Sequence, residues 1–424
     1  MKRYAKYRPS GVEWIGEMPV QWEVKRLKFN TYIKARVGWH GLRADEFSLT
    51  EGVYCVTGTD LLNGGVSWEN CYRVSEERYE EDPFIQLREN DLLITKDGTI
   101  GKVAIVRNLN ERATLNSGVF VVRPERKEYV TPFMYWALQS PVFSEYVNYT
   151  SKGSTINHLY QETFFNLPFI LPEIDEQPAI AHYLDERTAQ IDTLIANKQK
   201  LIELLKEERT AIINQAVTKG INPKGKLKPS GIEWLGDIPE HWEVKKLKYV
   251  LDCFDSKRVP LNAAERGEVK NIYDYYGASG VIDKVGDYLF DGDFILIGED
   301  GANLLTRSTA LAFKATGKFW VNNHAHILKP KDGNIDYFTY LLESIDYAIW
   351  VSGSAQPKLT ADNLMNITIC EPPLLEQHTI AHHIGTHISR IDATISKIEK
   401  EIELLQEYRT ALISEVVTGK VKVV

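Results

Sequence analysis

The feature that most constrains the fold of this chain is that its sequence repeats itself. Residues 7–28, YRPSGVEWIGEMPVQWEVKRLK, recur as residues 227–248, LKPSGIEWLGDIPEHWEVKKLK. Residues 171–220 recur as residues 371–420 at a constant offset of 200 and without a gap. The order is a short motif, a variable region and a long segment, and then the same three parts again. Two copies are too few for a solenoid, so the repeat predicts two structurally equivalent halves.

The order of the repeated parts also predicts where the chain ends lie. The second motif, 227–248, follows directly on the first long segment. If a pseudo-twofold axis relates the halves, as in an isologous dimer, the first motif lies beside the end of the second long segment. The two termini are therefore expected to lie close together.

The long segments carry the pattern of paired helices. Their apolar residues recur in steps of four and three, which is the heptad spacing of a supercoiled pair. The predicted seam consists of Leu184, Ile191, Ile195, Ile202 and Leu205 in the first copy and of Ile384, Ile391, Ile395, Ile398, Ile402 and Leu405 in the second. Arg209 and Arg409 interrupt this seam at matching sites, where they are candidates for fixing the register.

A helix over residues 184–216 is about 48 Å long, at roughly 1.5 Å per residue. Neither apolar stripe can be buried by itself, and the simplest partner for each is the other. The two helices then run antiparallel if the halves obey a twofold. The alternative is that each helix lies on its own globular domain, but the long and narrow stripe favours the pair.

The two variable regions have the pattern of small α/β (α+β) domains. In the first, we expect strands at 53–57, 91–95, 102–106 and 118–123, then a helical stretch at 131–149. In the second, we expect strands at 293–297, 309–313 and 326–329, then a helix at 335–350. Asp97-Gly98 and Asp300-Gly301 are turn signals in similar places. Each region closes with a Gly-Ser loop, a short helix and a last strand, at 167–171 or 367–370.

These patterns divide the chain into six parts. The parts are a first repeat motif at 1–28, a variable domain at 29–170, a long helix at 171–220, a hinge with the second motif at 221–248, a second variable domain at 249–370 and a second long helix at 371–424. The fold class is therefore two α/β domains in pseudo-twofold copies, joined by two long helices that form an antiparallel coiled coil.

Composition excludes several other classes of protein. The 43% of hydrophobic and 25% of charged residues are ordinary globular values. No apolar run approaches the roughly 20 residues of a membrane span, and the basic start leads into no apolar signal core. Four scattered cysteines without a C-x-x-C pair predict reduced thiols rather than a zinc site or a disulfide framework.

No motif for catalysis survives inspection, so we expect no catalytic residue and no metal site. Residues 220–226 fit G-x-x-x-x-G-K, but Leu227 stands where a nucleotide-binding loop has Ser or Thr for Mg²⁺. The histidines at 382, 383 and 387 come without the H-E-x-x-H base, and His324-Ala325-His326 has neither Glu nor C-x-x-C for a zinc deaminase. No methyltransferase cofactor motif is present, and the short E-x-K strings match chance.

Loops with Lys, Arg, Asn and His are the usual means of contacting phosphates and bases, so the variable regions supply candidates for DNA binding. The candidates are Lys34, Arg36, His40, Arg43, Lys96, Asn116, Lys152, Asn157 and His158 in the first region and Lys257, Arg258, Arg266, Asn303, Arg307, Asn322, Asn323, His324 and Lys358 in the second. For each of them an ordinary solvated surface residue is the competing interpretation. Trp14, Trp22, Trp234 and Trp242 are identical in both motifs, so we expect them to pack between motif and domain rather than to stack on bases.

The doubled P-S-G-[VI]-E-W-x-G-x-x-P-x-x-W-E-V-[KR]-x-L-K motif and the E-Q…I-A-H…I-D…E-x-R-T-A helices resemble the DNA-specificity subunit of type I restriction–modification enzymes. The resemblance spans essentially the whole chain. It implies two target-recognition domains, at about 29–170 and 249–370, that each read one half of a bipartite double-stranded DNA sequence. The helix pair would then be the ruler that sets the gap, whereas the target bases and gap length are not implied because the reading surfaces differ between members.

The same resemblance implies partners and a location. Two modification (methyltransferase) subunits would dock on the helices and repeats, and two restriction (motor-nuclease) subunits would join for cleavage. S-adenosylmethionine, ATP and Mg²⁺ would belong to those partners, with no cofactor in this chain, and the complex would lie in the cytoplasm of a bacterium or archaeon. A self-contained DNA enzyme and a coiled-coil scaffold that binds only proteins are the competing hypotheses.

The charge of the chain refines this expectation. The 58 acidic residues outnumber the 50 basic ones, which gives a net charge of −8. Attraction to phosphates is a local property of a groove, so an acidic total can coexist with two DNA-reading surfaces. We expect the isolated chain to bind DNA weakly and with strong salt sensitivity, and tight binding to need the modification subunits.

Overall fold

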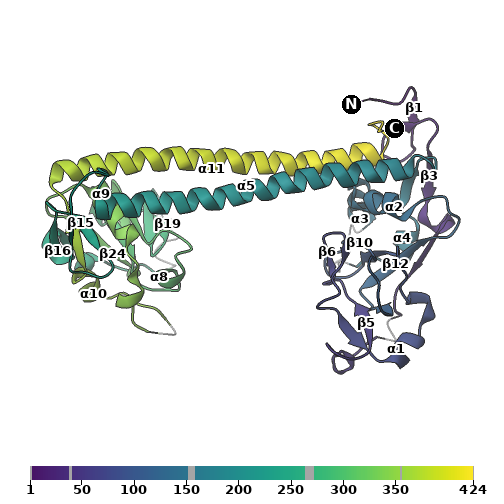
Figure 1. Cartoon of the computed structure of the whole chain (residues 1–424), viewed down its shortest axis with the longest axis horizontal. Coiled ribbons are helices and arrows are strands. Elements are labelled where there is room, and N and C mark those ends of the chain that lie inside the picture. The colour runs from purple at the N-terminus through teal and green to yellow at the C-terminus, as the bar shows by residue number, and fades with distance from the viewer. Residues whose placement is uncertain (1, 38–40, 151–157, 263–271, 354–355, 424) are drawn as a thin grey trace. The chain divides into compact units, whose positions relative to one another are not determined.

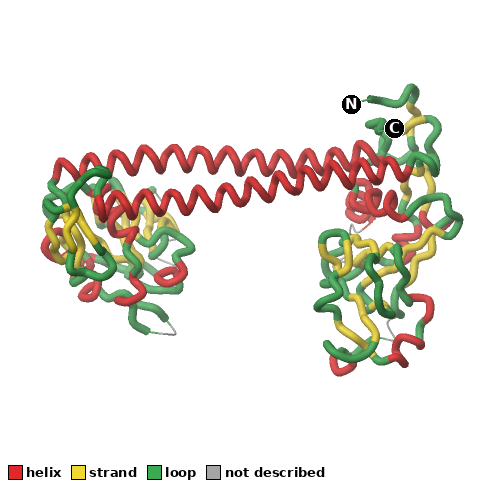
Figure 2. The backbone as a smooth tube through the Cα atoms, viewed as in Figure 1, coloured by secondary structure: helices red, strands yellow, loops and turns green. Residues whose placement is uncertain are grey.

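The computed structural model describes residues 2–37, 41–150, 158–262, 272–353 and 356–423. The chain divides into two compact units, one formed by Met1–Lys198 with Lys400–Val424 and the other by Gln199–Glu399. Each unit holds one repeat motif, one variable domain and half of each long helix, which confirms the predicted duplication. The long helices are α5 (Gln177–Lys219) and α11 (Leu374–Val417), and both are unbroken in Figures 1 and 2.

Contacts within each unit show that the two helices run antiparallel. In the first unit Asp192 pairs with Arg409 and Lys198 pairs with Glu401, so residue numbers rise along α5 while they fall along α11. In the second unit Arg209 lies opposite Asp392. The antiparallel helix pair predicted from the heptads is therefore confirmed.

The predicted seam lies on the covered side of these helices. Among its residues, Leu184, Ile191, Ile384, Ile391 and Ile398 are buried, and Ile195, Ile202, Leu205, Ile395, Ile402 and Leu405 are half-buried. The leucines off the seam, at 194, 201, 204 and 404, are 44–50% exposed. The apolar stripe is thus as narrow as a helix pair requires. The first turns of α5 also join the core of the neighbouring domain through Ile180, Ala181 and Leu184.

The variable domain of the first unit is built on two sheets. The first sheet has the order β10-β9-β12-β4 and is antiparallel throughout, with β4 at Thr31–Lys34, β9 at Leu92–Thr95, β10 at Val103–Ile105 and β12 at Val119–Pro124. The second has the order β11-β5-β8, with β5 at Val53–Val56, β8 at Tyr72–Val74 and β11 at Ala113–Leu115, and β11 is parallel to β5. Helices α1 (Glu76–Glu80), α2 (Thr131–Gln139), α3 (Pro141–Thr150) and α4 (Gln161–Phe165) and the short strands β6 (Leu61–Leu62) and β7 (Gly65–Val66) complete it. The central strand β12 is buried on both faces, as a strand between two apolar layers must be.

The variable domain of the second unit repeats this plan. Its first sheet has the order β17-β24-β21-β22, with β17 at Leu251–Cys253, β21 at Phe294–Gly298, β22 at Ala312–Ala315 and β24 at Ala325–Pro330. Its second sheet has the order β19-β18-β23-β20, with β18 at Tyr273–Gly277, β19 at Gly280–Val285, β20 at Phe290–Asp291 and β23 at Lys318–Val321. The domain also contains the helices α8 (Asn303–Thr306), α9 (Ile335–Ser344) and α10 (Ala361–Met365). Their places along the chain match or adjoin those of the helices in the first domain. Strands β21 and β24 correspond to β9 and β12.

The repeat motifs join each domain to its helices. In the first unit β1 (Tyr7–Pro9) pairs with β2 (Glu17–Pro19), and β3 (Glu23–Arg26) pairs with β13 (Pro168–Leu171). In the second, β14 (Leu227–Pro229) pairs with β15 (Asp237–Pro239), and β16 (Glu243–Lys246) pairs with β25 (Thr368–Glu371); α6 (Leu247–Val250) follows. Trp22 and Trp242 are fully buried, and Trp14 and Trp234 pack on Tyr146 and Trp350 of their domains. The tryptophans therefore pack between motif and domain, as predicted.

The chain ends meet in the first unit. The Lys422 amide donates to the Lys2 carbonyl at 2.9 Å, and Gly419 lies against Pro19 and Trp22 of the first motif. Figure 1 shows the N and C labels close together. The prediction drawn from the order of the repeat is confirmed.

Three predicted elements differ from the structure. The helical stretch at 131–149 is two helices, because Pro141 forces the preceding Ser140 into an extended conformation. The helix predicted at 335–350 ends at Ser344 and continues only as a 3₁₀ turn at Tyr347–Trp350. The strand predicted at 309–313 begins later, at Ala312, because the Leu311 and Ala312 amides donate to the Glu343 carboxylate at 2.9 Å.

In the described parts of the chain, no helix has both the length and the apolar character that crossing a membrane requires.

Candidate nucleic-acid interface

The two units share one backbone frame at the end of their central strands. The Leu159 amide donates to the Lys96 carbonyl at 2.9 Å, and the Leu359 amide donates to the Glu299 carbonyl at 2.8 Å. Isolated bridges join Asp97 to His158 and Asp300 to Lys358. We call these places the first and second strand-end sites. They lie where strands pass into loops, which is where binding residues are commonly held by a rigid scaffold.

The two units also share the backbone hydrogen bond between this strand end and the loop before the next strand of the sheet. The Lys96 amide donates to the Gly118 carbonyl at 2.9 Å, and the Glu299 amide donates to the His324 carbonyl at 2.8 Å. Gly118 and His324 are therefore equivalent positions. Lys96 and Glu299 are equivalent as well, so the two sites share a backbone and differ in charge.

The first strand-end site is centred on Asp97. Its carboxylate accepts from Lys96 Nζ at 3.0 Å and contacts His158 Nδ1. Burial alone would raise the pKa of the Asp97 carboxyl, but the hydrogen bonds from Lys96 and His158 outweigh it and hold the pKa below its ordinary value. His158 also packs edge-on against the exposed ring of Tyr160.

A pocket of about 600 Å³ adjoins the first strand-end site. Its lining combines the rings of Phe47 and Tyr72 with polar groups at Thr57, Thr59, Asp97 and Asn116. The two rings lie 5.3 Å apart, and Tyr72 is 43% exposed. The site is thus a concave polar surface with aromatic walls.

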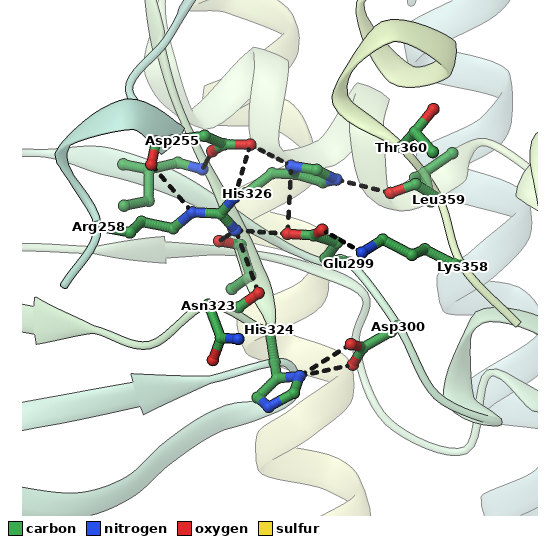
Figure 3. Close-up of polar contacts among 12 residues, drawn as sticks. Asp255, Arg258, Glu299, Asp300, Asn323, His324, His326, Lys358, Leu359 and Thr360 are labelled. Carbon is green, nitrogen blue, oxygen red and sulfur yellow. Dashed lines mark hydrogen bonds and ion pairs between the residues drawn. The ribbon is translucent and has the colours of Figure 1, made fainter. Parts of the chain in front are cut away.

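The second strand-end site is a network of charges, shown in Figure 3. Glu299 accepts from Arg258 Nη1 at 2.5 Å and from Lys358 Nζ at 3.1 Å. Asp255 lies 2.5 Å from His326 Nδ1 and accepts from the Ile327 amide at 2.9 Å. Desolvation opposes ionisation of Asp255 and Glu299, but the hydrogen bonds from His326 and from Arg258 and Lys358 keep both pKa values below their ordinary range.

The buried ring of His326 is held at both nitrogens. Nδ1 faces the Asp255 carboxylate, and Nε2 lies 2.8 Å from the Leu359 carbonyl, which can only accept. The ring therefore donates at Nε2 and is fixed between two segments of the domain. Its equivalent in the first unit is Phe120, a core residue, so this network is particular to the second unit.

Asp255, Glu299 and His326 present ligand atoms within 4.8 Å of one another, which is close enough to surround a metal ion. The chemistry of the cluster does not fit one. Arg258 and Lys358 already neutralise Glu299, and both nitrogens of His326 are engaged. A cation there would be repelled by two others, so we assign the cluster a structural role.

The structure brings together eight of the residues predicted from sequence. Lys96, Asn116 and His158 lie at the first strand-end site, and Arg258, Asn322, Asn323, His324 and Lys358 lie at the second. Of these, His324 and Lys358 keep about half of their side chains exposed, at 48% and 51%. The His324 ring contacts Asp300 at 2.8 Å, as Figure 3 shows.

Other predicted residues hold the fold together instead. Arg36 is only 2% exposed and donates through Nε to the Leu115 carbonyl at 2.9 Å, which argues against a direct DNA contact. Arg307 adopts a left-handed conformation and donates to the Ile345 carbonyl at 2.5 Å. Asn303 accepts from the Thr309 amide at 3.0 Å and so closes a loop. A long basic side chain can thus serve packing and backbone hydrogen bonds rather than a partner.

The remaining predicted residues make none of these contacts. Lys34 is exposed, and Arg43 forms surface ion pairs with Asp45 and Glu46 at 3.6 and 3.8 Å. Lys257 is exposed in the turn that begins with Asp255, and its Nζ lies over the Phe254 ring. Four candidates, His40, Lys152, Asn157 and Arg266, lie outside the described residues.

The sequence of the chain matches the type I restriction modification DNA specificity domain twice, over residues 45–204 and 239–404. Each match covers most of one variable domain and part of the helix that follows it. Together the matches span well over half of the chain. The chain belongs to this family.

Relatives within the type I specificity family match nearly the whole chain. The MjaVIII specificity subunit of Methanocaldococcus jannaschii is 27% identical over 435 residues, covering 96% of this chain and 94% of the relative. The MjaIX specificity subunit of the same archaeon is 24% identical over 443 residues, covering 96% and 95%.

Two solved structures share the fold. A chain from a structure concerned with complex assembly and conformational transition of the type I R-M system has a TM-score of 0.74 at 14% identity, covering 95% of this chain and 99% of that one. The HsdS subunit from Thermoanaerobacter tengcongensis has a TM-score of 0.56 at 14% identity, covering 95% and 98%. The arrangement of two variable domains on an antiparallel helix pair is therefore one that occurs in the type I specificity family.

Reasoning from sequence missed the carboxylates of both sites. Asp97, Asp300, Glu299 and Asp255 orient the basic residues, but a search for DNA contacts selects cations and amides. One signal was present, since Asp97-Gly98 and Asp300-Gly301 stand at matching places in the two halves. An Asp-Gly pair is also an ordinary turn signal, so the sequence alone does not mark these residues as part of a site.

Proposed function

We propose that this chain is the DNA sequence-recognition subunit of a type I restriction–modification complex and has no catalytic activity by itself. One observation carries the proposal: the two domains share a backbone frame at their strand-end sites but present different side chains there. A fixed scaffold with two different surfaces is what two readers of different sequences require. Membership of the type I specificity family supports DNA as the target, which would be double-stranded.

Each domain would read one half of a bipartite site, and the helix pair would fix the gap between the halves. Half-sites on one face of B-DNA lie about 34 Å apart, or a multiple of this. Helix α5 has 43 residues, which corresponds to about 65 Å at roughly 1.5 Å per residue. Its length is therefore sufficient to span one such interval.

The partners of the chain would supply the chemistry. Two nearly identical motifs, in which Trp14 and Trp234 each pack on an aromatic residue of their own domain, offer two similar docking surfaces for two modification subunits. Two restriction subunits would join for cleavage, and S-adenosylmethionine, ATP and Mg²⁺ would bind to these partners. The complex would work in the cytoplasm, where the host DNA lies.

The site geometry also bears on affinity. At the first strand-end site Lys96 is paired with Asp97, and at the second Arg258 and Lys358 are paired with Glu299, so these cations are already partly neutralised. Affinity for DNA comes mainly from contacts between the phosphates and Lys or Arg side chains that are not already paired with a carboxylate. The chain alone should therefore bind DNA weakly, and the modification subunits should supply the remaining cations.

Sequencing methylated bases in host DNA, with and without this chain, tests the proposal. A bipartite methylated motif that disappears when the chain is removed is the expected result. Methylation or cutting by the purified chain without partners would overturn the non-catalytic assignment. Loss of the chain without any change in methylation, in a host with active modification subunits, would favour the protein-binding scaffold.

A further inference from the structure

Each unit fixes a histidine with a carboxylate at the same corner of its sheet. His158 Nδ1 contacts Asp97, and His324 Nδ1 lies 2.8 Å from Asp300 Oδ2. Asp97 and Asp300 occupy equivalent positions, whereas His158 precedes α4 and His324 precedes β24. The two domains thus reach the same pairing with side chains from different segments.

In both pairs Nδ1 is the nitrogen that faces the carboxylate, so Nε2 is on the other side of the ring. Among the described residues neither Nε2 has a hydrogen-bond partner. The side chains are accessible, at 26% exposed for His158 and 48% for His324. A carboxylate at one ring nitrogen fixes the orientation and tautomer of the ring. Each histidine therefore presents a single directed hydrogen-bonding atom at the surface.

The neighbouring carboxylates favour a base over a phosphate as the partner of this atom. The Asp97 side chain is 43% exposed and that of Asp300 18%, so a phosphate close to either ring would meet a negative charge. Phosphate contacts are generally made by unpaired Lys and Arg side chains. A base edge offers donors as well as acceptors, and both an imidazole and a carboxylate can pair with it.

The residues that surround the two histidines differ, as is expected if the two domains read different bases. The position of His158 is taken by Lys358 in the second unit, and the position of His324 is taken by Gly118 in the first. The first site opens beside the pocket of about 600 Å³ that Asn116 and Asp97 help to line. The second is flanked by exposed Asn323 and by Lys358, as Figure 3 shows.

We propose that His158 and His324 are specificity-determining residues, each reading the edge of one base pair in its own half of the DNA target. Asp97 and Asp300 are positioning residues that hold the rings. This inference rests on the proposed function of the chain as a DNA-reading subunit.

The test uses the full chain in complex with its modification subunits. The target is read from methylated host DNA, and binding is measured to duplexes in which each base pair of the target is replaced in turn. The unaltered complex should discriminate roughly 10-fold or more at each pair that is read directly. His158→Ala should reduce that ratio to about 1 at one base pair of one half, and His324→Ala at one base pair of the other half, with all other ratios kept.

Two further sets of variants separate positioning from folding. Asp97→Asn and Asp300→Asn should lower the ratio at the same base pairs by a smaller factor, because the rings stay but are held less firmly. Glu125→Ala and Asp332→Ala are control variants, since both exposed residues follow the ends of β12 and β24 that lie away from the strand-end sites, and all ratios should stay unchanged.

Several results would overturn the inference. Uniform weakening on all duplexes would indicate phosphate contacts, and unchanged ratios would remove the histidines from recognition. His158→Gln and His324→Gln keep a hydrogen-bonding side chain of similar size, and failure of both the Ala and the Gln variant of a histidine to assemble with the modification subunits would indicate a structural role. Absence of any bipartite target for the unaltered complex would instead overturn the proposed function itself.

Discussion

Arg409 on α11 donates through Nε to Asp192 Oδ1 on α5 at 2.8 Å, across the helix pair of the first unit. In the second unit Arg209 Nε lies 3.9 Å from Asp392 Oδ1, which is the same pair of positions at an offset of 200. The partners are substantially exposed, so each pair stabilises the fold by well under 1 kcal/mol. A slip of the helices would break both pairs at once, so their role is to select the register.

Reversing the charge of one partner should lower the stability of the helix pair, and reversing the charge of the other partner as well should restore it. Asp192→Lys places two cations together, and we expect the free energy of unfolding to fall by about 1 kcal/mol. Adding Arg409→Asp should restore most of this loss in urea unfolding of the full chain. The control is Glu203→Lys, because Glu203 pairs with Lys200 of the same helix and forms no ion pair with the described residues of α11. A double variant no more stable than Asp192→Lys would show that the pair does not select the register.

The two glycines that end the long helices should differ in their tolerance of a side chain. Gly419 and Gly220 both have a positive φ, of 74° and 71°, which costs alanine about 1–2 kcal/mol. A Cβ at Gly419 would also lie 2.5 Å from Pro19 and 2.8 Å from Trp22, whereas the nearest atoms to one at Gly220 are 3.4 Å away. Hydrogen exchange under native conditions should therefore show a loss of about 3 kcal/mol for Gly419→Ala and about 1 kcal/mol for Gly220→Ala. Equal losses would contradict the close packing of the first motif on the end of α11.

The two buried tryptophans of the repeat motifs should also differ. Trp22 Nε1 donates to Glu176 Oε2 at 2.8 Å, whereas Trp242 Nε1 has no hydrogen-bond partner in the described parts of the chain. The equivalent carboxylate, Glu376, lies 2.7 Å from His241 Nε2 instead. Replacement by Phe removes similar packing at both sites but a hydrogen bond only at Trp22. Trp22→Phe should cost about 1 kcal/mol more than Trp242→Phe in the unit that holds it, as measured by hydrogen exchange. The reverse order would contradict the assigned partners.

The charge network of the second unit predicts acid lability. The pKa values of Asp255 and Glu299 are below their ordinary values of 3.8 and 4.5 in the folded state, so this stability is present above those values. It is lost as the pH falls through the lowered values, when Arg258 and Lys358 lose the negative charges with which they pair. The protection of the β21 and β24 amides against hydrogen exchange, measured relative to the intrinsic exchange rate at each pH, should therefore fall below about pH 4.5.

A substitution tests the origin of this lability. Glu299→Gln should destabilise the second unit by about 2 kcal/mol at neutral pH, because it leaves two cations beside a nearly buried site, and should flatten the acid dependence. The exposed Glu243 also has a lowered pKa, through its hydrogen bond with Lys245, but solvent screens this pair, so Glu243→Gln should change the acid profile of β21 and β24 much less than Glu299→Gln does. An unchanged profile for Glu299→Gln would remove the network as its cause.

The elements predicted well from the sequence are those whose residues recur at a regular spacing. The heptads located both long helices, and the constant offset of the repeat placed the termini together, because each pattern is repeated many times along the chain. Short strands such as β4 and β17 were not predicted, since three or four residues carry too little pattern to separate a strand from a loop. The break at Pro141 is not predicted, although the proline is visible in the sequence, because the helical pattern continues on both sides of it.

The candidate sites were predicted only in part, because they depend on contacts between distant segments. Asp97 meets His158 across 61 residues of chain, and Asp255 meets His326 across 71. Residue type alone cannot tell Arg36, which is buried in the fold, from Lys358, which is half exposed. The signal that could have found the sites is the pairing of equivalent positions in the two halves, here the two Asp-Gly turns.

Exchange of one recognition domain tests the central claim most directly. Residues 29–165 are replaced by the corresponding domain of another member of the family, and methylated bases are then sequenced in host DNA that expresses the modification subunits. The account predicts that one half of the bipartite motif changes while the other half and the gap stay the same. A change in both halves, or in neither, would contradict the assignment of one half-site to each domain.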